Sequence, residues 1–293
     1  EIKQLFYQLL ILDEQRKLLQ SADSMFANFQ QKIKQRFESG DIDILEMATA
    51  DNQRMQISNQ LIQLETNYAF LLDRFNLMLN APVSYSPASG QVQYLLPILP
   101  DSNALKRNYN RQLREQELLF SQQQLQLEKS RLLPSLSAGF SNTTIMGWQT
   151  PNADATDFYF GSSRRFSSLN VGVGIPLFFG AQKSRIRASR FSVLQKQQEL
   201  DALNQELNLQ LTNALRVYQR NNQLVQSFSQ TMIPNANTMI RTASEKLTAG
   251  EIGYIDWVVL VNQAMQIKSD YYFTIQQFNE AAFEIEKISN INP

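Results

Sequence analysis

Two carboxylates, Glu46 and Asp256, occupy matching positions in a sequence repeat. Shifting the chain by 210 residues aligns two stretches that begin at Gly40 and Gly250, and each acid follows its glycine by six residues. Carboxylates gathered in one place favour cations. Near the start of a helix, acids instead complement the helix dipole. Both interpretations stay open at this point.

The composition excludes several kinds of chemistry. The 293 residues include no Cys and no His, so disulfides, Cys/His zinc sites, a Cys nucleophile and a His-based triad are absent from this chain. Lys plus Arg equals Asp plus Glu at 27 each, which gives no basic field for nucleic acid. No carboxylate pair has a spacing typical of general acid–base work. We therefore expect no enzyme, no cofactor and no metal site.

Apolar residues three, four or seven apart predict long helices over 1–37 and about 45–79, joined at Gly40. The same spacing recurs over 103–132, over 181–247 with Pro234 as the only interruption, and over 254–290. No apolar run reaches the 18 residues of a membrane-spanning helix. The predicted fold is mainly α, with long antiparallel coiled-coil helices.

A change of period after Pro134 predicts strands. Apolar residues alternate with small polar ones at Leu136, Ala138 and Phe140, and again at Leu169, Val171, Val173 and Ile175. We expect one inserted β-hairpin over 134–179, with a long loop at 142–165. An isolated hairpin is marginal in water, so it needs a partner sheet or lipid. A soluble hairpin packed on helices is the alternative.

The repeat divides the chain into three predicted parts. Residues 1–80 form the helical hairpin of a first repeat, whose beginning would lie before Glu1. Residues 81–101, rich in Pro, form a linker. Residues 102–293 form a second repeat, which contains a helix, the β-hairpin, a long helix, the Gly250 turn and a returning helix.

This order of elements resembles the TolC-type outer-membrane efflux channel family, including its heavy-metal efflux branch. The resemblance is carried by LLPSLSAGF at 132–140, NVGVGIPLFFG at 170–180, and the turns SGDIDILEMATADNQ and AGEIGYIDWVVLVNQ. It implies an outer-membrane exit duct for passive transport, with its helices extending into the periplasm. It also implies a homotrimer that shares a β-barrel in outer-membrane lipid, docked on a periplasmic adaptor protein and an inner-membrane pump of the RND type.

The resemblance also assigns roles at the turns. Glu46 and Asp256 would form a pore constriction, because Asp256 matches a family aspartate, while a second family acid falls on Val259. The residues expected at the helical tip, in contact with the adaptor, are Gly40, Asp41, Asp43, Gly250 and Glu251. The scattered methionines are interpreted as packing residues, and no motif specifies a metal ion, a drug or another substrate. The alternative function is a structural coiled-coil or adhesin-like module without channel activity.

Overall fold

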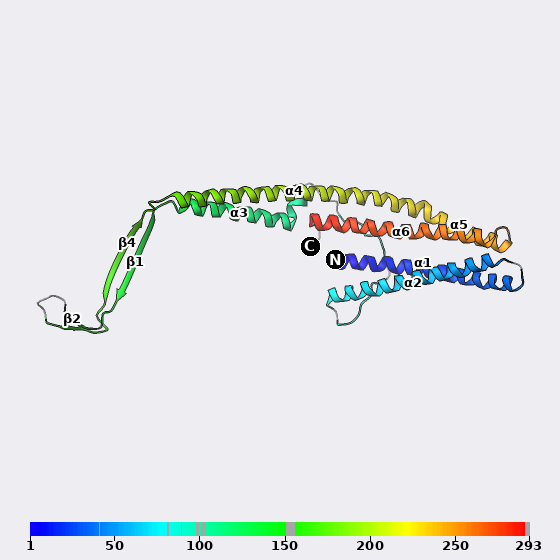
Figure 1. The fold of residues 1–293 in the computed structure, drawn as a ribbon, viewed down its shortest axis with the longest axis horizontal. Helices are drawn as coiled ribbons and strands as arrows, with labels where there is room; N and C mark the ends of the chain where they lie inside the picture. Colours follow the sequence, from blue (N-terminus) through cyan, green and yellow to red (C-terminus); the bar gives the residue numbers. More distant parts are fainter. Residues whose placement is uncertain are drawn as a thin grey trace. The chain divides into compact units, whose positions relative to one another are not determined.

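The computed structural model describes residues 1–40, 42–80, 82–88, 90–97, 100, 104–150 and 156–290. The chain packs as two compact units. The first unit comprises Glu1–Asn108 and Glu206–Pro293, and the second comprises Tyr109–Gln205. Each unit is described by itself below, with the element labels of Figure 1.

Two helical hairpins make up most of the first unit. Helix α1 (Ile2–Glu38) turns back into α2 (Ile44–Leu79), and α5 (Ile233–Ala249) turns back into α6 (Tyr254–Ser289). A short 3-10 helix, η1 (Ala104–Arg107), adjoins α6. The long antiparallel helices predicted from the apolar spacing are thereby confirmed (Figure 1).

The helix that contains Pro234 continues through it. Helix α4 (Gly180–Ser227) leads into a π-helical turn, η2 (Phe228–Met232), and then directly into α5. Within this turn the N–H of Ile233 bonds to the carbonyl of Phe228, five residues earlier. Proline lacks an N–H and clashes with the preceding turn of an α-helix. The wider π turn lies where this conflict would arise, so the predicted interruption at Pro234 is a local change of helix type.

Three clusters of buried side chains hold the first unit together. The largest lies at the turns and contains residues of both hairpins, including Phe26, Ala50, Ala243 and Trp257. A second cluster joins Ile11 of α1 and Val225 of α4 to α6, where Tyr218 stacks on Phe278 with ring centroids 4.5 Å apart. A third lies between α1 and α2 around Leu5, Leu9 and Phe75. The hairpins are therefore joined mainly through contacts of α6 with α1.

The described part of the predicted linker contains no helix or strand and is held by α6. The Asn279 side chain donates from Nδ2 to the Val92 carbonyl and accepts at Oδ1 from the Tyr94 N–H. Each of these hydrogen bonds is 2.7 Å long. Glu286 accepts from the Tyr94 hydroxyl and forms an ion pair with Lys3 of α1 at 2.9 Å. The linker is thus fixed to the hairpins by both its backbone and its side chains.

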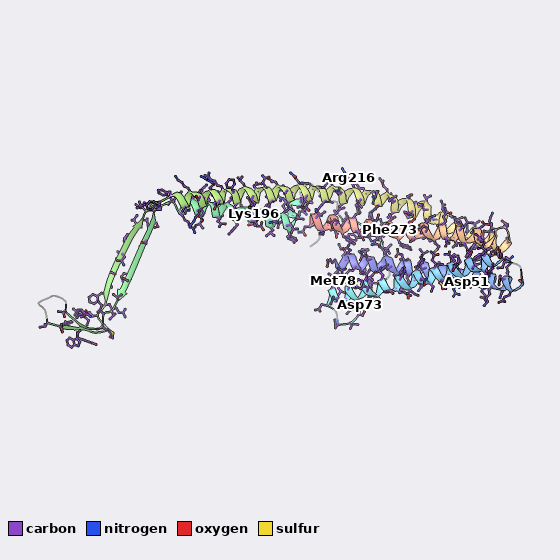
Figure 2. All side chains as sticks on the ribbon, viewed as in Figure 1. Asp51, Asp73, Met78, Lys196, Arg216 and Phe273 are labelled. Carbon is purple, nitrogen blue, oxygen red and sulfur yellow. The ribbon has the colours of Figure 1, made fainter. Side chains whose placement is uncertain are left out.

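In the second unit, α3 (Tyr109–Ser130) lies beside the first part of α4. Polar contacts join the two helices, such as that of Lys196 with Glu117 at 3.1 Å (Lys196 is labelled in Figure 2). The helix expected over 103–132 is interrupted, because η1 ends at Arg107 and α3 begins only at Tyr109. Asn108 between them donates its side-chain amide to the Ile288 carbonyl, so a tertiary contact accompanies the break.

The predicted β-hairpin is confirmed. Strands β1 (Ser135–Thr143) and β4 (Phe166–Gly174) pair in antiparallel register, with Leu136 opposite Val173 and Phe140 opposite Leu169. The long loop predicted at 142–165 is wrong in part, because β2 (Gly147–Gln149) and β3 (Phe158–Phe160) form a second small sheet there. Contacts between aromatic rings stabilise this sheet although its strands are short.

Candidate functional site at the two helical turns

In each hairpin the first helix ends at a glycine whose backbone is left-handed. Gly40 has a φ of +80° and Gly250 a φ of +75°. Their N–H groups bond back to the carbonyls of Phe37 and Leu247, at 3.0 and 3.2 Å. A β-carbon at either position would have no atom within 4 Å. Glycine is favoured at both turns because of its backbone conformation, and not because space is short.

The returning helices are matched over their whole length. Helices α2 and α6 each contain 36 residues, and each ends at an asparagine with positive φ, Asn80 at 48° and Asn290 at 52°. The residues before the two helices, Asp43 and Gly253, are extended, with ψ values of 156° and 165°. The 210-residue offset seen in the sequence therefore relates equivalent helix starts and ends in the structure.

The two candidate acids lie in the first turns of α2 and α6, where each is the third residue of its helix. Glu46 is half-buried and Asp256 is exposed. The Asp256 carboxylate turns back toward the helix start, since its Oδ2 lies 3.6 Å from where a β-carbon of Gly253 would be. This geometry suits a carboxylate that complements the helix dipole, and it also leaves Asp256 accessible to solvent.

The other turn residues are mostly at the surface. Asp43 and Glu251 are exposed, and Glu251 lies 3.7 Å from the Lys246 ammonium. Asp41, which was predicted to belong to the same tip, lies outside the described residues. An exposed ion pair of this kind contributes little to stability.

Trp257 joins the two turns, and the sequence patterns did not single it out. It follows Asp256, is 0% exposed, and lies against Phe26 and Phe29 of the other hairpin with ring centroids 5.0 and 4.0 Å away. Its indole N–H donates to the Ser244 hydroxyl at 3.1 Å. The sequence feature that could have identified it is its position directly after Asp256, one of the two matched acids. Because this contact joins the hairpins, both turns lie at the same end of the first unit (Figure 1).

Behind the turns, α1, α2 and α6 surround an uncharged, amide-rich cavity of about 570 Å³. Its walls include Gln15, Gln60 and Gln266, and no lining residue carries a charge. At one side Gln53 and Asn262 exchange two hydrogen bonds of 3.0 Å, which connect α2 to α6. Figure 2 labels Asp51 on α2, toward the turns, and Asp73 farther from them along the same helix.

Within the described residues, no helix combines the length and apolar character needed to cross a membrane. The same residues contain no group of three or more acidic side chains that could hold a metal ion.

Comparison with known proteins gives matches to solved structures only. No family model matches the chain, and no curated protein matches it by sequence. The outer-membrane channel OprN matches with a TM-score of 0.84 and 15% identity, over 100% of this chain and 65% of that one. A membrane protein from Pseudomonas aeruginosa matches with a TM-score of 0.84 and 13% identity, over 99% and 66%.

The Campylobacter jejuni CmeC outer-membrane channel matches with a TM-score of 0.81 and 14% identity, over 98% of this chain and 61% of that one. The chain spans less than two thirds of the length of both CmeC and OprN. Identities this low establish the fold alone. The chain therefore has the long-helix fold of the outer-membrane efflux channels. The predicted resemblance to the TolC-type family is confirmed for the fold.

Proposed function

We propose that this chain is a large part of a passive exit duct in a bacterial outer membrane. Substrates would pass from the periplasm to the outside, driven by an inner-membrane pump of the RND type through a periplasmic adaptor. The observation that carries the proposal is the fold match over essentially the whole chain to solved outer-membrane channels.

The β1–β4 hairpin supports a location in the membrane. Leu136, Phe140, Leu169 and Val171 are 68–80% exposed, and the strand register places them on one face. The opposite face carries serines, glycines, Thr143 and Asn170, with Phe166 at its outer end. An apolar face beside a small polar one is typical of a strand pair between lipid and an aqueous lumen. A sheet with two open edges must also be closed by other strands, which supports a homotrimer.

The glycine turns of the first unit support a duct entrance at that end of its two hairpins. We propose that the two hairpins are copies of one repeat, because their helix starts and ends match at a constant offset. Asp256 and Glu46 would then contribute carboxylates to a constriction. Gly40, Asp41, Asp43, Gly250 and Glu251 would form the tip that contacts the adaptor. The uncharged cavity behind them would offer polar contacts without holding an ion.

The test is single-channel recording of the full-length protein in a planar bilayer. We expect conductance with a cation preference that falls in Asp256→Asn and Glu46→Gln, because a ring of carboxylates favours cations. Asp270→Asn is the matched control, since Asp270 is an exposed acid of α6 away from the turn. Conductance with unchanged selectivity would leave the acids as helix-dipole partners only. Absence of conductance would favour the structural coiled-coil or adhesin-like alternative.

A further inference from the structure

The small β2–β3 sheet has an open aromatic face. Trp148 lies directly opposite Tyr159, with ring centroids 5.5 Å apart. Their exposed fractions are 69% and 52%. Both rings are large apolar bodies with one polar group, the indole N–H or the phenol hydroxyl. Two such rings side by side on an exposed sheet form a patch of the kind that marks an interaction site.

The opposite face of the same sheet is partly covered, since Phe160 is half-buried while Phe158 remains 50% exposed. Strand register places Phe158 and Phe160 on that face, because they alternate with Tyr159. The Arg164 guanidinium lies 5.1 Å from the ring centroid of Phe158 and 5.0 Å from that of Phe160. Phe160 also packs on Phe166, the first residue of β4, at 5.6 Å. These contacts fix the small sheet to the end of the longer hairpin and leave the Trp148–Tyr159 face turned away.

The length of the longer hairpin favours lipid as the cover of the open face. Its strands have nine residues each, within the roughly 9–11 residues that a tilted strand needs to cross a bilayer core. At its helix-proximal end Phe178 is 92% exposed. Aromatic side chains therefore lie beyond both ends of an exposed apolar strand pair. Tryptophan and tyrosine are enriched where a membrane meets water, because that layer solvates both the ring and its polar group.

We propose that the Trp148–Tyr159 face binds the headgroup layer of a lipid bilayer and anchors the outer end of the hairpin there. The inference rests on the proposed function, because the hairpin must be inserted for the face to meet lipid. Arg164 acts as a positioning residue, since it covers the back of the small sheet and so holds the pair in place. A protein partner is the less favoured occupant, because the pair lies beyond the end of an apolar strand pair that itself requires lipid.

Trp148 provides its own reporter. The chain has two tryptophans, and Trp257 is 0% exposed in the first unit. Subtracting the emission of Trp148→Phe from that of the wild type therefore isolates the Trp148 signal. The full-length protein is reconstituted in phosphatidylcholine vesicles whose acyl chains carry bromine either near the headgroup or near the bilayer centre. Channel conductance of the same preparation shows separately whether the protein is inserted.

The expected result is a blue-shifted Trp148 emission that loses most intensity to the shallow bromines and little to aqueous acrylamide. Arg164→Gln should weaken this preference, whereas the control Arg187→Gln, an exposed arginine of α4, should leave it unchanged. Acrylamide quenching as strong as that of free indole, in a preparation that conducts, would overturn the anchor and leave the duct intact. Strong quenching by the deepest bromines would also overturn it, because the ring would then lie in the hydrocarbon core. A preparation that neither inserts nor conducts would contradict the proposed function, and with it the anchor.

Discussion

Replacing Asn279 by alanine should release the linker from α6. The side chain is 2% exposed and makes two 2.7 Å hydrogen bonds, one to the Val92 carbonyl and one from the Tyr94 N–H. Each buried polar group left without a partner costs about 1–3 kcal/mol. Val92 and Tyr94 are only half-buried, so water can partly replace the amide. The lower end of the range applies, which gives about 2 kcal/mol for the pair.

Hydrogen exchange of the linker amides measures this loss directly. A cost of about 2 kcal/mol corresponds to roughly 30-fold more frequent opening and equally faster exchange over 90–97. Asn279→Asp keeps the acceptor for the Tyr94 N–H but turns a buried carboxylate oxygen toward the Val92 carbonyl oxygen, so its acceleration should be at least as large. Asn76→Ala is the matched control, because Asn76 makes the same two contacts with the exposed backbone of Tyr85, at 3.0 and 2.7 Å.

The reasoning predicts a clear order of effects. Asn279→Ala and Asn279→Asp should both accelerate linker exchange strongly, and Asn76→Ala should have little effect on residues 90–97. Unchanged exchange in Asn279→Ala would refute the claim that this amide holds the linker. An equal effect of Asn76→Ala on residues 90–97 would show that the linker opens for a reason other than the loss of the Asn279 contacts.

Three further substitutions test local contacts. Tyr254→Phe should stabilise the protein by about 1 kcal/mol, because the Tyr254 hydroxyl is buried with no hydrogen-bond partner among the described residues. Burial, with a smaller contribution from Asp51, raises the pKa of Tyr254 to about 12. The contribution of Tyr254 to the free energy of unfolding should therefore fall between pH 10 and 12. Gly250→Ala should cost about 1 kcal/mol through its positive φ alone. Gly174→Ala should destabilise the hairpin, because its β-carbon would lie 2.6 Å from the Ser135 hydroxyl, and Ser135→Ala should restore it.

Urea denaturation followed by circular dichroism measures the first two substitutions. The pH dependence has a definite sign, because the folded state holds the Tyr254 proton more tightly than the unfolded state and therefore loses stability above pH 10. The phenylalanine variant should show a smaller decrease, because burial also raises the pKa values of Tyr271 and Tyr272, and an identical decrease would assign all of it to other groups. A cost well above 1 kcal/mol for Gly250→Ala would reveal a steric conflict. For Gly174→Ala, failure of Ser135→Ala to rescue would show that the hydroxyl is not the obstacle.

Much of the fold could be predicted because it follows from local periodicity. Apolar spacing locates the long helices, and alternation around Phe140 and Val171 locates the paired strands. Left-handed turns were predictable because glycine at 40 and 250 ends each helical pattern. These features depend on neighbours in the sequence and need no knowledge of the tertiary structure.

The remaining features depend on contacts between distant residues. The π turn lies in a stretch whose side chains, such as Phe228, pack against α6. Strands β2 and β3 have three residues each, too few for a period to appear, and Arg164 supports them from outside the strands. Asn279 meets Tyr94 across 185 residues. Both candidate acids were predicted in the first turns of their helices, but their role in a constriction remains a proposal because exposure alone fits both interpretations.

Accessibility of position 256 during conduction tests the central claim most directly. This chain contains no Cys, so Asp256→Cys in the full-length protein introduces a thiol at the turn, with the unsubstituted protein as the blank. A cationic methanethiosulfonate reagent added during single-channel recording should lower the conductance, because each adduct adds bulk and positive charge to the entrance. Asp270→Cys should react without that change. Complete labelling of Asp256→Cys with unchanged conductance would contradict the claim that the Gly250 turn lines the duct.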